Sequence, residues 1–135
     1  MNKLEFLESI KGFTTYETIS NDFEKLDESL KNDKSFLLDA IQINSEVFKV
    51  ISDELKNDKD FVLLAVKYNG GILESASDRL KDDFDVVLNA VKENGATLYY
   101  ASDRLKDNEE IVQAAINQWA VSINYASSRL YEKFK

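Results

Sequence analysis

The chain has 135 residues, with 17 Lys and Arg against 25 Asp and Glu, so its formal net charge is −8, and 44% of its residues are hydrophobic. This length suits one globular domain, and the apolar fraction is too high for a disordered chain. Because the sequence holds no Cys and no His, it excludes a disulfide framework, a thiolate nucleophile and metal ligation by His.

The N-terminal pattern, the lack of a long apolar stretch and the charge together predict a soluble protein. Glu5 and Glu8 interrupt the apolar pattern near the N-terminus, which is not the pattern of a signal peptide. No stretch approaches the roughly 18 apolar residues that a membrane span needs. Direct nucleic-acid binding needs clustered Lys and Arg, which an acidic chain does not favour. We therefore expect a cytoplasmic protein that binds neither membrane nor nucleic acid directly.

Residues 1–29 are predicted to form a degenerate N-terminal capping repeat. Asn2 and Glu5 have the spacing of a capping box at the start of a first helix, which Gly12 would end. Phe23 and Leu26 match apolar columns of the repeats that follow. The segment therefore resembles a repeat without reproducing its whole pattern.

Residues 30–129 contain four tandem repeats with a spacing of 25 residues. The spacing holds for a leucine column at Leu30, Leu55, Leu80, Leu105 and Leu130 and for an alanine column at Ala40, Ala65, Ala90 and Ala115. It also holds for a serine column at Ser52, Ser77, Ser102 and Ser127. So many columns in one register indicate a repeat architecture.

Each repeat is predicted to form two helices of about ten residues, because its apolar residues recur at helical spacing. Asx residues such as Asp58 and Asp83 precede the first helix and suit N-caps. Asn69 with Gly70, and Asn94 with Gly95, follow it, and we expect a left-handed C-cap there.

Such short helices need neighbours for stability, so we predict an all-α fold, an α-solenoid of stacked two-helix repeats. At the end of the array Trp119 takes the place of the column Asn, and Ala120 takes the place of Ser45, Gly70 and Gly95. Residues 130–135 are expected to form a tail that frays or packs over the last repeat.

The repeat has a distinctive sequence pattern: Leu-Lys-Asn-Asp-Lys at its start, Ala-Val-Lys at its centre and Tyr-Ala-Ser-Asp-Arg-Leu at its end. This pattern resembles the repeats of domain of unknown function 4116, and residues 55–80 and 80–105 match it best. The resemblance implies paired short helices in tandem. It carries no catalytic residues to transfer, and by analogy of fold it suggests an interaction role.

Aromatic residues near the C-terminal end are the candidate partner-binding site. Tyr100 and Tyr125 share a column about 160° from the core face of the second helix, and each stands four residues before an Arg that could stack on it. Tyr and Arg are enriched at binding hot spots. The candidate residues are Tyr99, Tyr100, Arg104, Trp119, Tyr125 and Arg129. The alternative is that these residues cover a terminal core or are simply exposed without a binding role.

Other polar groups have structural explanations that we favour over functional ones. Acidic clusters could bind a divalent cation, but helix N-capping explains them in every repeat; they are Asp82, Asp83 and Asp85, then Asp107, Glu109 and Glu110. A second set could form a recognition stripe or, as we expect, salt bridges between neighbouring repeats; it pairs Asp53, Asp78 and Asp103 with Arg79, Arg104 and Arg129. The asparagine column could bind a ligand's peptide group or, as we expect, its side chains satisfy helix-end carbonyls or one another; its members are Asn44, Asn69 and Asn94.

These observations favour a non-enzymatic protein-interaction module without a cofactor or metal, since no catalytic or metal-binding motif is present. One alternative is a small acidic inhibitor that blocks the basic nucleic-acid channel of a nuclease or defence-system enzyme. Residues 1–29 hold three Lys and seven acids, a balance of −4, whereas residues 55–79 balance to zero. A third alternative is self-association of the repeats into a homo-oligomer.

Overall fold

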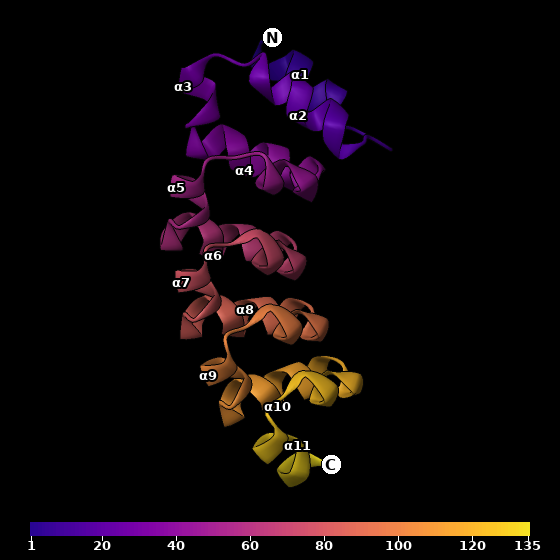
Figure 1. The fold of residues 1–135 in the computed structure, drawn as a ribbon. Coiled ribbons are helices and arrows are strands. Elements are labelled where there is room, and N and C mark those ends of the chain that lie inside the picture. Colours follow the sequence, from indigo (N-terminus) through magenta and orange to yellow (C-terminus); the bar gives the residue numbers. More distant parts are fainter. The chain divides into compact units, whose positions relative to one another are not determined.

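The computed structural model describes all 135 residues, and every regular element in it is a helix (Figure 1). The chain divides into two compact units, Met1–Lys56 and Asn57–Lys135. The first unit contains α1 (Lys3–Ser9), α2 (Tyr16–Glu24), α3 (Glu28–Lys31), α4 (Lys34–Ile43), the 3₁₀-helix η1 (Ser45–Lys49) and α5 (Asp53–Lys56). The second contains α6 (Lys59–Tyr68), η2 (Gly70–Ser75), α7 (Asp78–Lys81), α8 (Phe84–Glu93), η3 (Gly95–Tyr100), α9 (Asp103–Lys106), α10 (Glu109–Gln118), η4 (Ala120–Tyr125) and α11 (Ser128–Phe134).

Every repeat contains a ten-residue α-helix, a 3₁₀-helix of five or six residues and a further short α-helix. The prediction of an all-α tandem repeat, solenoid-like in its organisation, is confirmed. The structure differs from the sequence prediction in the second segment, which is not one continuous helix. The backbone becomes extended at Ala76 and Ala101, with ψ of 162° and 157°, so the 3₁₀-helix ends there. Ser77 and Ser102 then cap a new α-helix.

The long helices begin at the predicted Asx caps. Asp83 accepts a hydrogen bond from the Val86 N–H at 3.1 Å, and Asn108 accepts one from the Ile111 N–H at 3.0 Å. Asp33 and Asp58 cap α4 and α6 in the same way. These contacts satisfy N–H groups that have no partner inside the helix. N-capping therefore accounts for Asp83 in the first acidic cluster. In the second cluster the cap is Asn108, which is not one of the acidic residues, so the prediction that capping explains the acids holds there only in part.

The predicted left-handed C-caps are wrong. Asn69 and Asn94 have extended backbones, with φ of −157° and −148°, and each caps the following 3₁₀-helix with its side-chain oxygen. Gly70 and Gly95 are glycines for a different reason: a Cβ built on Gly70 would lie 2.5 Å from the carbonyl oxygen of Ala90. The next repeat thus packs directly against the glycine backbone. The left-handed glycine of the chain is Gly12, with φ of +72° just after α1.

Within the second unit α6, α8 and α10 pack side by side, and the 3₁₀-helices line up beside them (Figure 1). The alanine column at Ala65, Ala90 and Ala115 is fully buried, as are Leu73 and Leu98. Small side chains let the long helices approach closely, and the apolar columns fill the space between repeats. The predicted core register is therefore the one that the structure has.

The short helices of the second unit are linked end to end. The Ser102 N–H donates to the carbonyl oxygen of Lys81 at 2.9 Å, and Ser102 Oγ donates to Asp82 Oδ1 at 2.5 Å. Arg104 donates from Nε to the same carboxylate oxygen at 2.9 Å and from Nη2 to the Asp82 carbonyl at 2.6 Å. The same side-chain contacts join Ser127 and Arg129 to Asp107, and Ser77 and Arg79 to Asn57.

We call this set of contacts the arginine ladder. It confirms that the arginines form polar links along the stack, but the predicted partners are wrong. Arg104 and Arg129 bind the residue that follows the preceding short helix, and not the aspartates of the Asp53, Asp78 and Asp103 column. The cause is the break before each short helix, which turns its first residues toward the end of the previous one.

The two terminal segments have structures of their own. Asn2 and Glu5 form the predicted capping box at the start of α1. Phe6 is buried at the centre of the first unit, with ring contacts to Phe23 and Phe36. At the other end the predicted tail is helical as far as Phe134, because α11 continues past the buried Leu130.

Candidate functional site: an aromatic pocket in the second unit

Four of the aromatic side chains singled out from the sequence lie together in the second unit. The rings of Tyr99 and Tyr100 are 5.2 Å apart between centroids, and those of Tyr99 and Tyr125 are 5.5 Å apart, both in edge-to-face geometry. The ring centroid of Trp119 lies 6.5 Å from that of Tyr125. The four side chains thus form one connected aromatic cluster.

The local backbone explains why these rings face outward. In η3 the side chains of Thr97 and Leu98 are buried, and the following two residues complete the turn on the other side. Tyr99 exposes 59% of its surface and Trp119 exposes 42%, whereas Tyr100 and Tyr125 are half-buried. Since η3 and η4 pack against each other, Tyr99 bridges the two tyrosines of the shared column.

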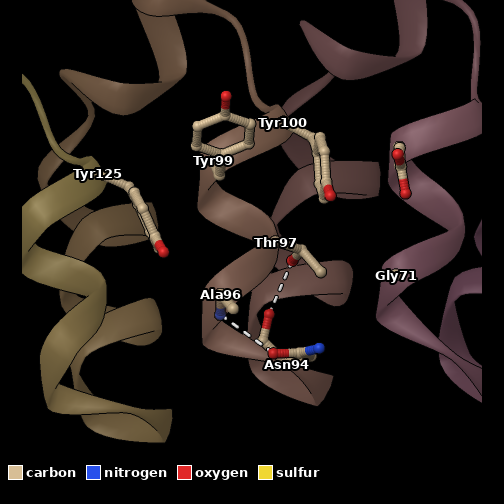
Figure 2. A pocket seen from close by; sticks show the side chains of 8 residues that line it. Gly71, Asn94, Ala96, Thr97, Tyr99, Tyr100 and Tyr125 are labelled. Carbon is tan, nitrogen blue, oxygen red and sulfur yellow. Dashed lines mark hydrogen bonds between the residues drawn. The ribbon is translucent and has the colours of Figure 1, made fainter.

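The cluster borders a pocket of about 370 Å³. Its lining, which we call the tyrosine pocket, consists of Gly71, Glu74, Asn94, Ala96, Thr97, Tyr99, Tyr100 and Tyr125. Figure 2 shows Tyr100 and Tyr125 on either side of Tyr99, with their hydroxyl groups turned the opposite way from that of Tyr99. A second pocket of about 350 Å³ shares Asn94 and Ala96 and adds Gln118 and Trp119. The aromatic cluster therefore lies along two adjoining pockets.

The polar groups of the tyrosine pocket are partly engaged by the backbone. Asn94 Oδ1 accepts a hydrogen bond from the Ala96 N–H at 3.1 Å, and Thr97 Oγ1 donates to the Asn94 carbonyl at 2.7 Å. Asn44, in the same column as Asn94, donates from Nδ2 to the Ile10 carbonyl at 3.2 Å. Asn44 therefore satisfies a carbonyl at a helix end, as predicted, whereas the oxygen of Asn94 caps an N–H group at the start of the next 3₁₀-helix.

Two of the candidate residues line neither the tyrosine pocket nor the adjoining pocket. Arg104 and Arg129 belong to the arginine ladder and donate to Asp82 and Asp107. The cation that lies over a ring of the cluster is Lys106, whose Nζ is 5.4 Å from the Tyr99 centroid. The prediction that an arginine stacks on each tyrosine of the column is therefore replaced by a lysine contact to the neighbouring ring.

The arginine ladder also sets the ionisation of its aspartates. The Ser102 hydroxyl and the Arg104 guanidinium lower the pKa of Asp82 below its ordinary value. The Ser127 hydroxyl and the Arg129 guanidinium do the same to the pKa of Asp107. Both carboxylates are therefore charged at neutral pH and engaged in structure, which leaves them without a role in the pocket.

Sequence reasoning missed Glu74, the one charged residue among the eight that line the tyrosine pocket. A signal was available, because Glu74 is 25 residues before Tyr99 and shares its column. That column varies from Lys49 through Glu74 and Tyr99 to Asn124. The variable column that contains Tyr99 and the adjacent one that contains Tyr100 together identify more of the pocket lining than either column does alone.

The structure also bears on metal binding and on membrane insertion. No group of three or more His, Cys, Asp or Glu side chains is placed to hold a metal ion. No helix has both the length and the apolar character to cross a membrane. The geometry that remains is an aromatic pocket with one carboxylate, which can hold a side chain by stacking and by ion pairing.

Comparison with known proteins bears on the repeats. No curated protein and no solved structure matches the chain. The family model described as a domain of unknown function (DUF4116) matches four overlapping segments, residues 16–56, 33–81, 58–102 and 83–131. These matches follow one another along the stacked repeats and together span most of the sequence. The chain therefore belongs to the DUF4116 family, as a tandem array of its repeats.

Proposed function

We propose that this protein is a non-enzymatic interaction module that presents a repeat-built helical surface to a protein partner. The observation that carries the proposal is the aromatic cluster around the tyrosine pocket, with Tyr99 and Trp119 markedly exposed. Exposed Tyr and Trp side chains beside a concave surface are typical of binding hot spots. They supply large, rigid contact area at a low cost in conformational entropy.

The organisation of the repeat supports this role, because the positions that hold the stack together differ from the positions of the pocket tyrosines. The serine and arginine columns make the ladder, and the alanine and leucine columns fill the core. The column of Tyr100 and Tyr125 holds Val50 and Ser75 in the earlier repeats, so its side chain can change without altering the stack. Variable positions on a fixed scaffold are how repeat proteins select their partners.

The same proposal includes the setting of the interaction. The partner is a protein, encountered in the cytoplasm, and neither nucleic acid nor a cofactor takes part directly. The absence of Cys agrees with a reducing compartment, and the net charge of −8 agrees with a partner that is not itself strongly acidic.

Selection from a library of displayed peptides tests the proposal. The immobilised full chain should enrich a family of related peptides, which should lose binding to the double variant Tyr100→Ala/Tyr125→Ala. Tyr68→Ala is the matched control, because Tyr68 is an exposed tyrosine of the same unit that lies outside the pocket lining. Circular dichroism and thermal melting should show that both variants remain folded.

Two results would count against the proposal. If no peptide family is enriched, the aromatic cluster is not a peptide-binding surface. If captured partners are basic nucleic-acid enzymes whose binding collapses with salt and ignores the tyrosine variants, the acidic-inhibitor alternative replaces it. Static light scattering against concentration checks the self-association alternative in the same preparations.

A further inference from the structure

We infer that the tyrosine pocket recognises an arginine side chain of the partner. The inference rests on the proposed function and names the chemistry that the pocket takes. It depends on three features of the second unit: an unpaired carboxylate, tyrosine rings beside it and a volume that suits one long side chain.

The unpaired carboxylate is that of Glu74. This exposed side chain forms no salt bridge or hydrogen bond within the chain, although it lines the pocket. Glu93 of the same unit is engaged by contrast, since Glu93 Oε2 accepts a hydrogen bond from the Gly70 N–H at 2.5 Å. Glu74 therefore gives the pocket a negative charge that the chain itself does not neutralise.

Three cations of the second unit already have contacts elsewhere. Arg104 is bound to Asp82 and Arg129 to Asp107. Lys106 lies against Tyr99 and shows that a ring of this cluster accepts a cation, but it is not part of the pocket lining. We assign the positive group that pairs with Glu74 to the partner, because Glu74 has no partner within the chain and the rings of Tyr100 and Tyr125 line the space that such a group would enter.

Arginine fits this combination better than other residues. Its planar guanidinium stacks on an aromatic face and can donate two hydrogen bonds to one carboxylate, whereas lysine is a compact and strongly hydrated charge. A volume of about 370 Å³ is at the small end of the roughly 300–1,000 Å³ of ligand pockets, which suits one side chain. An acidic side chain would be repelled by Glu74 and by the net charge of −8.

Nuclear magnetic resonance titration of the ¹⁵N-labelled full chain tests the inference. The probe is a short glycine-serine peptide with one arginine, and its control is the same peptide with citrulline, which keeps the shape of arginine without its charge. We expect chemical-shift changes centred on the pocket lining, including Glu74 and Thr97. The citrulline peptide should bind about three- to thirtyfold more weakly, because it lacks both the ion pair and the cation–π contact.

Substitutions locate the contact. Glu74→Gln should weaken arginine-peptide binding about two- to fivefold, and Tyr100→Ala/Tyr125→Ala should abolish the localised shifts. Glu110→Gln is the matched control, because it removes another exposed carboxylate of the same unit that lies outside the pocket lining. It should leave binding unchanged.

The outcomes separate this inference from the proposed function. Equal binding of the two peptides, shifts centred elsewhere, or no shifts at millimolar peptide would overturn the arginine assignment. If displayed peptides still bind through Tyr100 and Tyr125 but carry no arginine, the proposed function stands and the assignment falls. If no displayed peptide binds, the proposed function itself fails.

Discussion

At the scale of single residues, glycine lets one repeat pack directly against the next. A Cβ on Gly70 would lie 2.5 Å from the Ala90 carbonyl oxygen and 2.7 Å from Glu93 Oε2. The first of these atoms is backbone of a buried helix, so it cannot move aside without displacing α8. The adjacent Gly71 differs, because the nearest atom to its Cβ would be a side-chain oxygen of Asn69 at 3.0 Å.

Gly70→Ala should therefore destabilise the protein by about 1–3 kcal/mol, the usual effect of forcing extra volume into a packed interior. Gly71→Ala is the matched control one residue away, and its effect should be clearly smaller. Urea unfolding followed by circular dichroism measures both. Equal stabilities of the two variants would show that the repeats can separate enough to admit a methyl group.

Individual residues also show how far the sequence alone reaches. The buried alanine column and the Asx caps follow from residue type and spacing, because each has a local physical cause. The pairing of Arg104 with Asp82 does not follow. This pairing depends on the direction of a short helix. The residues next to Arg104 in the sequence do not determine that direction.

At the scale of elements, the second segment of each repeat was the hardest to predict. Its apolar residues fit helical spacing throughout, so periodicity does not distinguish one helix from a 3₁₀-helix followed by a short α-helix. The serine column held the missing signal, because Ser77 and Ser102 accept hydrogen bonds from the N–H groups of Leu80 and Leu105. A serine three residues before a leucine in every repeat indicates a new helix start.

The arginine ladder predicts a pH dependence of stability. The pKa of Asp82 and that of Asp107 are lowered by their serine and arginine contacts. A carboxyl group with a lowered pKa in the folded state stabilises that state above its ordinary pKa of about 3.9, and the contribution is lost as the pH falls through the lowered value. Asn57 makes the same contacts without a charge, so asparagine can keep the geometry.

We therefore expect Asp82→Asn/Asp107→Asn to lose part of its free energy of unfolding at neutral pH and to approach the wild type as the pH falls below about 4. The measurement is urea unfolding over a pH series. Asp78→Asn/Asp103→Asn removes two charges outside the ladder and serves as the control. Parallel curves for the two double variants would contradict the role of the ladder, whereas Asn57→Asp should add acid sensitivity.

At the scale of the whole molecule, each step along the second unit reproduces the previous one. The Ser102 N–H donates a hydrogen bond to the Lys81 carbonyl oxygen at 2.9 Å, and 25 residues later the Ser127 N–H donates to the Lys106 carbonyl oxygen at the same distance. The Gly95 N–H donates to Gln118 as the Gly70 N–H donates to Glu93. Stability in such arrays is approximately a sum of repeat and interface contributions.

Deletion of residues 82–106 should therefore leave a folded chain. Lys81 would then precede Asp107, and the Ser127 N–H would meet the Lys81 carbonyl in place of that of Lys106. We expect a helical circular dichroism spectrum and one cooperative melt at a lower temperature than the wild type. Deletion of residues 82–94 removes half a repeat and should abolish the cooperative melt. Similar melts for the two deletions would show that register is unimportant.

Because the hydrogen bonds between successive repeats are equivalent, the array has a particular way of changing during evolution. DNA that encodes one repeat can be lost or duplicated in frame, and the new neighbours still present matching donors and acceptors to each other. The tyrosine pocket does not survive such an event unchanged, because it needs unlike residues from η2, η3 and η4 in one order. The length of the array and the partner that it recognises are therefore separate traits: one changes by whole repeats, and the other by single substitutions.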